Sequence, residues 1–213
     1  MSITRSITRA ITRAITRPLG GITACWFDGT DDFIASTGTP LPVSADWAMS
    51  FEMWIDPTWT PGVNTYFMGQ RTSSGNQMMF GLDSAGTTAR FLVGASTGTI
   101  AGLSKGVPYL CTIARVGNDF TATVTGIGST TLNVAHSLTA VAGTFKVGTA
   151  HSLTTFFKGV IRDVVVDGVL SWLGIGNTAF DWEDQIGSDD GNLNGSPVPA
   201  YSTNNGATWA LTA

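Results

Sequence analysis

The chain has 213 residues, of which 26 are glycine and only 12% are charged, and its formal net charge is −4. This length is enough to bury a substantial core, and many glycines with few charges are typical of short strands joined by tight turns. No apolar run is long enough to cross a bilayer, which excludes membrane insertion, and the acidic balance argues against nucleic acid as a partner of the main domain.

The chain begins with a four-residue repeat of the form x-Ile-Thr-Arg. It places isoleucine and arginine at Ile3, Arg5, Ile7, Arg9, Ile11, Arg13, Ile15 and Arg17. In a helix the isoleucines would form a narrow slanted stripe, whereas in a strand every isoleucine and arginine would lie on one face. The β-branched residues favour the extended form, and Pro18 ends the segment. We therefore predict a basic assembly arm over residues 1–21; a disordered tail is the alternative.

Charge is divided unevenly between this arm and the rest of the chain. The repeat carries four of the 11 basic residues and no acidic one, which leaves seven basic against 15 acidic residues, a net charge of −8. Opposite charges attract over long range in a salt-dependent way. An arm from one copy could therefore lie on the body of another copy or on an acidic partner protein.

The rest of the chain is predicted to be all-β. Residues 48–56 alternate, with Met49, Phe51, Met53 and Ile55 on one face and Glu52 and Trp54 on the other. Two short apolar runs within 25–35 flank an Asp-Gly turn, which predicts a hairpin or a bend. Further strands are expected at 64–70, 78–83, 89–94, 107–116, 120–125, 130–134, 143–147 and 156–167. A short helical turn is expected near 177–185.

The pattern predicts one domain over residues 22–187 and an irregular segment over 188–213. Glycine, asparagine, serine and proline dominate this last segment, and we expect it to pack on the sandwich or on a neighbouring copy. The two cysteines, Cys25 and Cys111, lie in strand-like surroundings and are expected to be buried free thiols, with a disulfide as the alternative. Free thiols agree with assembly in a reducing cytoplasm.

Four segments carry a family resemblance. They are FDGTDDFI at 27–34, SFEMWIDP at 50–57, YLCTIAR at 109–115 and FKGVIRDV at 157–164. In order and spacing they resemble landmarks of the concanavalin A-like, laminin G-type jelly roll. The resemblance implies two antiparallel sheets packed face to face, with the first and last strands adjacent, but fold alone does not fix function.

Jelly rolls of this type include glucan hydrolases, which resemble one another in a strand motif Glu-x-Asp-x-x-Glu that this sequence lacks. The nearest carboxylates are Glu52 and Asp56, about 13 Å apart along a strand. Glycoside hydrolysis needs carboxyl groups about 5 to 9.5 Å apart, so we expect no catalysis. His136 and His151 stand alone, without a nucleophile or a metal-ligand spacing.

Two groups of residues are candidates for binding. Asp28, Asp31 and Asp32 offer hard oxygen ligands near a turn, and the resemblance implies that calcium at a rim loop is one role; the alternative is that they shape the turn. The tryptophans Trp47, Trp54, Trp59 and Trp182 are the candidates for stacking on a glycan. Because Trp54 faces away from the apolar row, it should either stack under the C-terminal segment or lie exposed.

A basic x-Ile-Thr-Arg repeat ahead of a laminin G-like domain resembles small virion proteins of tailed bacteriophages. The resemblance implies a non-enzymatic protein of the virion surface, with the arm bound to other virion proteins and the jelly roll displayed outward as a homotrimer. Host-glycan attachment, as in a tail fibre, is the main expectation, and capsid decoration is the alternative; a glycoside hydrolase is a remote third. No cofactor is expected apart from the candidate calcium ion.

Overall fold

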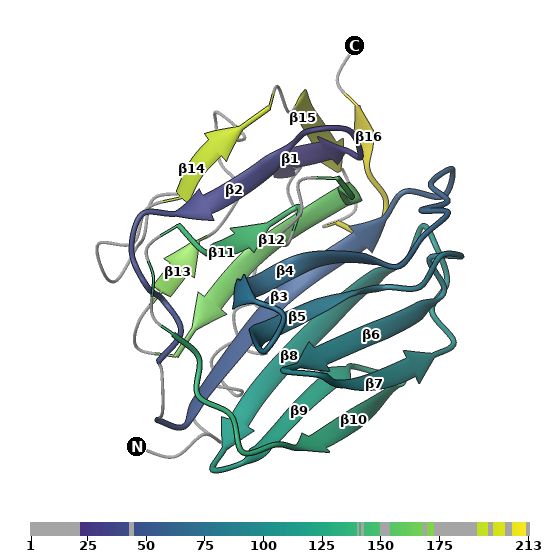
Figure 1. The fold of residues 1–213 in the computed structure, drawn as a ribbon. Helices are drawn as coiled ribbons and strands as arrows, with labels where there is room; N and C mark the ends of the chain where they lie inside the picture. Colours follow the sequence, from purple (N-terminus) through teal and green to yellow (C-terminus); the bar gives the residue numbers. More distant parts are fainter. Residues whose placement is uncertain are drawn as a thin grey trace.

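The protein is a two-layered antiparallel β-sandwich, as the sequence predicted (Figure 1). In the computed structural model the described residues are 22–42, 45–139, 141, 143–149, 154–167, 170–172, 191–195, 198–202 and 206–211. The predicted arm, Trp182, His151 and the helical turn near 177–185 lie outside them. The described residues contain no helix, and so none that is long and apolar enough to span a membrane.

The larger sheet contains the strands that carry the site described below. Its order is β10 (Gly128–Asn133), β9 (Asp119–Val124), β8 (Pro108–Val116), β3 (Trp47–Ile55), β12 (Lys158–Val166), β1 (Ile22–Asp28), β15 (Val198–Ser202) and β16 (Ala210–Leu211), with β13 (Leu170–Trp172) also paired to β12. Strands β8, β9 and β10 are consecutive hairpins, whereas β1, β3 and β12 are brought together from distant parts of the chain. The first strand, β1, lies beside β12, which carries the last of the four resembling segments, as the family resemblance implied, and its other neighbour is β15.

The second sheet is built around a meander. Its order is β14 (Gly191–Asn194), β2 (Phe33–Ser36), β11 (Phe145–Val147), β4 (Thr65–Ser73), β5 (Asn76–Leu82), β6 (Thr88–Val93) and β7 (Ser96–Ala101). Because β1 and β2 belong to different sheets, the Asp-Gly turn between them is a bend and not a hairpin. Strand β7 was missed in the sequence because its serine, threonine and glycine residues carry little apolar signal.

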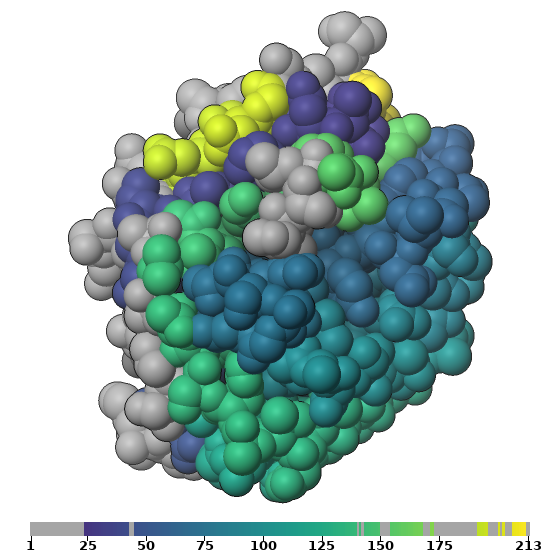
Figure 2. Space-filling model, viewed as in Figure 1, coloured from purple at the N-terminus to yellow at the C-terminus, as the bar shows by residue number. Residues whose placement is uncertain are grey.

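The prediction of an irregular C-terminal segment is wrong where the structure describes that segment. Strand β14 extends one sheet along β2, and β15 and β16 extend the other along β1. In the space-filling view the yellow-green atoms of β14 lie directly against purple atoms from the start of the chain (Figure 2). Edge strands are held by backbone hydrogen bonds, which asparagine and glycine can also make, so composition alone concealed these strands.

The core lies between the two sheets and is rich in aromatic rings. The inward face of β3 supplies Met49, Phe51, Met53 and Ile55, as the alternation predicted. Phe51 packs edge-on against Phe80 of the opposite sheet, with ring centroids 5.4 Å apart. Such pairs contribute about 0.5–1.5 kcal/mol beyond their area burial.

The two cysteines belong to this core. Cys25 and Cys111 are free and buried, which confirms the prediction over the disulfide alternative. Burial raises the pKa of both thiols, and the charge of Asp32 raises that of Cys25 further. Both sulfurs are therefore protonated and unreactive in the folded protein.

His136 makes stability sensitive to acid. It packs near Phe120, with ring centroids 6.4 Å apart, and its Nε2 is buried without a partner among the described residues. Burial, and then the charge of Arg115, lower its pKa below 6.5. The unfolded chain therefore binds the proton more readily, and we expect the free energy of unfolding to fall as pH drops below about 6.5, until the folded-state pKa is passed. Urea unfolding between pH 7.5 and 5 measures this.

His136→Gln should remove the part of the pH-dependent fall in unfolding free energy that His136 causes, and the matched variant His151→Gln should retain it. An equal pH dependence of the wild type and His136→Gln would contradict the assignment.

Candidate functional site

The candidate site lies on the outer face of the larger sheet, where β3 and β12 run side by side. Their register places Glu52 opposite Arg162 and Trp54 opposite Val160. Successive residues of a strand point to opposite faces, so Glu52 and Trp54 face outward because their odd-numbered neighbours face the core. The alternation predicted this direction for both side chains.

Arg162 is a buried cation in the middle of β12. The residue is only 5% exposed, its Nη2 donates to Glu52 Oε2, and its Nε lies 3.9 Å from Asp163 Oδ2. Asp163 has a φ of 53° and sits at a register shift between Arg162 and Val165. Because this irregularity turns Asp163 out of the regular alternation, the Asp163 carboxylate can lie beside the guanidinium of the adjacent residue, Arg162.

A small apolar cluster covers the sheet beside this ion group. Its members are Ala24, Trp26, Trp54, Val160, Ala200 and Trp209. The rings of Trp26 and Trp54 lie 5.5 Å apart, and the Arg162 guanidinium lies 5.5 Å from the ring of Trp209. Trp209 comes from the C-terminal part of the chain, so of the two predicted alternatives for Trp54, the structure selects stacking under that segment.

Gly206 allows this segment to approach the arginine. Its φ is +85°, and a Cβ placed on it would lie 2.7 Å from Arg162 Nη2. Its N–H donates to Ser202 Oγ at 2.8 Å, which fixes the turn. A residue with a side chain would be strained at this φ and would collide with the guanidinium.

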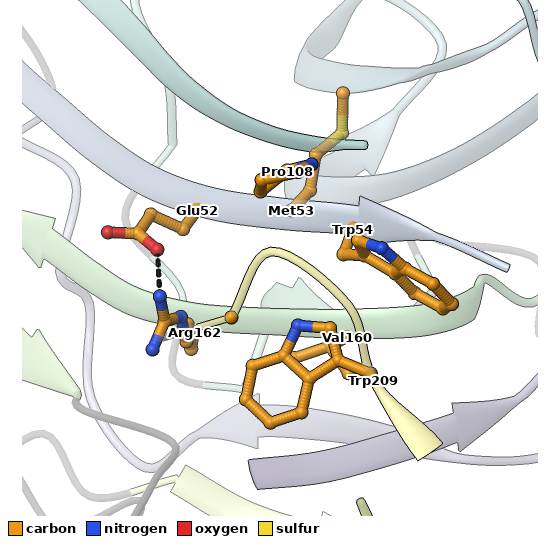
Figure 3. A pocket seen from close by; sticks show the side chains of 8 residues that line it. Glu52, Met53, Trp54, Pro108, Val160, Arg162 and Trp209 are labelled. Atoms are coloured by element: carbon orange, nitrogen blue, oxygen red, sulfur yellow. Dashed lines mark hydrogen bonds and ion pairs between the residues drawn. The ribbon is translucent and has the colours of Figure 1, made fainter. Parts of the chain in front are cut away.

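Between the ion group and the two indoles lies an open-sided hollow with about 170 Å³ of free space. Figure 3 shows Glu52 and Arg162 meeting across the strands, with the indoles of Trp54 and Trp209 to one side. The hollow is lined by Glu52, Met53, Trp54, Pro108, Val160, Arg162, Gly206 and Trp209. Because part of this space is open solvent, the hollow is much smaller than the pockets that enclose drug-sized ligands and can contact only one edge of a ligand.

Two N–H donors of the lining residues are buried without a hydrogen-bond partner in the described part of the chain. They are Arg162 Nη1 and Trp54 Nε1. Leaving a buried donor unpaired costs about 1–3 kcal/mol, so such groups call for an explanation. Both donors have almost no accessible surface, so what the hollow itself presents is the ion pair of Glu52 with Arg162 and aromatic surface.

Of the three predicted glycan-stacking tryptophans that the structure describes, Trp54 alone lines the hollow. Trp47 is 3% exposed and packs in the core against Phe120, because β3 begins one residue earlier than predicted and places Trp47 on the inward face. Trp59 is 9% exposed and packs edge-on against Phe157, with ring centroids 5.3 Å apart. Trp47 and Trp59 therefore belong to the core and not to the candidate site.

The carboxylates weighed for catalysis have separate partners. Glu52 is bonded to Arg162, whereas Asp56 accepts hydrogen bonds from Thr58 and lies 3.4 Å from Lys158 Nζ. Each carboxylate is held by its own cation, so these two do not form the acid and base pair that glycoside hydrolysis uses.

The structure brings the three predicted metal-ligand candidates together. One carboxylate oxygen of each of Asp28, Asp31 and Asp32 lies within 4.8 Å of the others, in the bend between β1 and β2. Asp32 is buried and accepts from the Asp28 N–H at 2.9 Å, and Asp28 accepts from the Thr30 N–H at 2.6 Å. Carboxylates that accept from nearby backbone N–H groups in this way commonly shape turns. The separation of the three carboxylate oxygens also suits a hard cation such as calcium.

We expect Asp32→Ala to lower the free energy of unfolding by about 1–3 kcal/mol in calcium-free buffer, because it removes the buried carboxylate that accepts from the Asp28 N–H. Thermal unfolding with EGTA and with 1 mM calcium separates the two roles. A variant as stable as the wild type in EGTA, together with a wild type stabilised by calcium, would contradict the turn-shaping role and support a metal site.

Sequence reasoning missed Arg162, Gly206 and Trp209 as members of the site. The signal for Arg162 was its place in the predicted strand at 156–167, between the apolar residues Ile161 and Val164, where a buried cation needs a partner. Gly206 gave no such signal, and it reaches the site together with Trp209 only through the pairing of β15 with β1 and of β16 with β15.

No protein-family profile and no curated protein matches the sequence. Solved structures do match the fold. A carbohydrate-binding protein from Bacteroides ovatus, described as putative, superposes with a TM-score of 0.66 at 13% identity over 87% of this chain. The chain spans only 61% of the length of that protein.

Two other matches have the same sandwich. A heptameric pentraxin from Limulus polyphemus gives a TM-score of 0.57 at 15% identity, covering 86% of this chain and 96% of its own. Domains LG4–5 of the mouse laminin α1 chain give 0.52 at 16% identity, covering 73% of this chain and 45% of theirs. The fold is therefore that of the concanavalin A-like, laminin G-like and pentraxin β-sandwiches, and at these identities the likeness concerns the fold alone.

Proposed function

We propose that this chain is a non-enzymatic attachment protein whose jelly roll binds a glycan at the outer-face hollow. One observation carries the proposal: the hollow is lined by the ion pair of Glu52 with Arg162 and by the two indoles of Trp54 and Trp209. Sugar hydroxyls both donate and accept hydrogen bonds, and the apolar faces of sugar rings pack on aromatic side chains. The match to a protein described as carbohydrate-binding agrees with this proposal.

The hollow is suited to hold one edge of a sugar within a longer chain. Because Arg162 is already ordered by Glu52 and by Trp209, little side-chain entropy remains to be lost on binding.

A glycan array probed with the labelled full chain tests this function. The matched control is the double variant Glu52→Leu with Arg162→Leu, which removes both charges together. We expect the wild type to bind a subset of glycans and the double variant to bind none of them. Failure of the wild type to bind any glycan, or equal binding by the double variant, would overturn the proposal.

We further propose that the protein acts on the surface of a phage particle, assembled in the host cytoplasm. Support comes from the repeat at residues 2–17, whose four arginines and four isoleucines cannot form a core of their own. In this proposal the arms of a homotrimer dock on other virion proteins, and each repeat makes the same contact with an extended or symmetric acceptor.

Deleting residues 2–17 should abolish incorporation into particles while leaving the jelly roll folded. Western blotting of purified particles measures incorporation, and circular dichroism of the isolated variant checks the fold. As a control, replacing the four arginines by lysine keeps the charge and should retain most of the incorporation. Normal incorporation of the deleted chain would end the anchoring proposal.

Capsid decoration is the second candidate function, and the same repeat favours it, because decoration also needs an anchoring arm. Decoration does not use the outer-face hollow. Particles that require residues 2–17 but carry a chain that binds no glycan would therefore favour decoration over attachment.

A further inference from the structure

We infer that the three copies of the proposed homotrimer associate head to tail, through a contact between the outer face of the second sheet of one copy and an acidic rim of the next copy. This inference rests on the proposed homotrimer and names the two surfaces that hold it together. The basic face comprises Arg71, Arg90 and Lys146, and the acidic rim comprises Asp46, Asp119 and Asp167.

Charge is separated between the second sheet and the rest of the domain. The seven strands of this sheet contain three charged residues, all of them basic: Lys146 in β11, Arg71 in β4 and Arg90 in β6. Of the seven basic residues outside the predicted arm, this leaves four against all 15 acidic residues. Two copies of such a chain can attract each other, because the basic region of one copy can face the acidic region of the next.

The three basic side chains share the outer face of the second sheet. The neighbours of Lys146 and of Arg90 along their strands lie in the core, so these two side chains point outward. Arg71 lies two residues after Gly69, which is opposite Lys146, and therefore shares this face. None of the three forms an ion pair with another described residue. From β11 to β6 these cations span three strand spacings, roughly 14 Å.

The middle of the basic face is apolar. Met79 and Leu92 lie side by side in the row of outward residues that begins with Lys146. Beside this row Arg90 donates from Nε to Tyr66 Oη at 3.4 Å. The centres of protein–protein interfaces are depleted in charge, and methionine, tyrosine and arginine are enriched in these interfaces. The basic face therefore has the composition of a protein-binding surface.

Lys146 is a half-buried cation without a counter-charge among the described residues. Its Nζ lies 5.3 Å from the centre of the Phe33 ring, and burial lowers the pKa of its ammonium group. Burying a charge is costly unless the charge is paired. A carboxylate from a second copy would therefore stabilise the charged form of Lys146.

The acidic rim lies at the end of the larger sheet where β8 and β12 end. Asp46 precedes β3, Asp119 begins β9 and Asp167 follows β12, and all three are exposed. None of them forms an ion pair with another described residue. Strands β9 and β12 are three spacings apart, so the carboxylates also span roughly 14 Å. Between them Val116 is 51% exposed, whereas the neighbouring cation Arg115 is 5% exposed.

The two surfaces match in span and in number of charges, but they face different directions. The basic face is the broad side of a sheet, whereas the acidic rim is formed by strand ends. In Figure 1 strands β4 to β7 lie in front of β3 and β8, and the rim lies toward the lower left. A contact between two different surfaces is heterologous, and such contacts form a ring when the rotation between copies closes. In a closed trimer each copy would bury one basic face and one acidic rim.

Two charge-reversal variants of the full chain test the inference. One carries Arg71→Glu, Arg90→Glu and Lys146→Glu, and the other carries Asp46→Lys, Asp119→Lys and Asp167→Lys. Sedimentation velocity should show a trimer for the wild type in about 50 mM salt, weakened at least 10-fold in about 1 M salt, and a monomer for each variant alone. An equal mixture of the variants should associate again, because each surface then meets one of opposite charge; this recovery also shows that both variants are folded.

Ser84→Lys is the control, since it adds a cation at the opposite end of the sandwich and should leave the trimer intact. A trimer that survives both sets of reversals, or variants that stay monomeric when mixed, would overturn this inference and keep the proposed homotrimer. A trimer that tolerates the reversals but is lost when residues 2–17 are deleted would assign the contact to the arm instead. A wild type that is monomeric at both salt concentrations would overturn both proposals. The glycan array tests attachment independently, because neither surface includes a residue of the hollow.

Discussion

Replacing Glu52 by leucine should lower the free energy of unfolding by about 3 kcal/mol, the lower end of the range for breaking a buried ion pair. The variant leaves the Arg162 guanidinium, 5% exposed, with Asp163 at 3.9 Å as its remaining counter-charge among the described residues. Arg162→Leu should cost less, because the Glu52 side chain is 16% exposed and its lone carboxylate can be partly hydrated. Urea unfolding monitored by tryptophan fluorescence measures both.

The double variant Glu52→Leu with Arg162→Leu should be close to the wild type in stability, since replacing a buried pair by apolar residues is often neutral or stabilising. The double-mutant cycle therefore predicts strongly non-additive losses. If the double variant lost the sum of the unfolding free energies lost by the two single variants, Glu52 and Arg162 would not be coupled. Because this variant keeps the fold while removing the polar groups of the hollow, it is also the control that separates binding from stability.

Gly159→Ala should destabilise the protein by about 2–6 kcal/mol, as the sum of backbone strain and of overpacking. Gly159 lies in β12 between Phe27 of β1 and Ile55 of β3. Its φ is +140°, and an added Cβ would lie 2.1 Å from the carbonyl oxygen of Trp54, which is backbone and cannot move aside cheaply. The same substitution should displace β12 from β3 and so disturb the register of Arg162 and Glu52.

Substitutions of two other glycines separate backbone strain from overpacking as causes of the lost stability. Gly62 has a φ of +74° with nothing within 4 Å of an added Cβ, so Gly62→Ala should cost about 1–2 kcal/mol from strain alone. Gly75 has free space and no such φ, so Gly75→Ala should change stability by about 0.5 kcal/mol or less. Equal losses at Gly159 and Gly62 would show that close approach to Trp54 is not what requires glycine in β12.

Local patterns in the sequence predicted the framework strands well. Alternation along 48–56 identified which side chains of β3 face the core and which face outward, because that period is a property of one strand. The closeness of Asp28, Asp31 and Asp32 was also predictable, since they share one bend. By contrast, β7 and the strands after residue 190 have weak side-chain signals and are formed through backbone pairing.

The site was only half predictable for a related reason. Glu52 and Trp54 were identified as outward-facing, but their partners Arg162 and Trp209 are 110 and 155 positions from them along the chain, and no local pattern joins them. The role of Trp47 was misjudged because β3 begins one residue earlier than predicted, which includes Trp47 in the alternation on the same inward face as Met49.

The most direct test of the proposed site is the indole region of the ¹⁵N spectrum during addition of a glycan that the array identifies. If the glycan binds at the outer-face hollow, the Trp54 and Trp209 indole signals should shift together with the Arg162 side-chain N–H signal, and the signal of the buried Trp47 should not shift. A bound glycan that shifts other signals and leaves those of Trp54 and Arg162 unchanged would contradict the assignment of the outer-face hollow as the binding site.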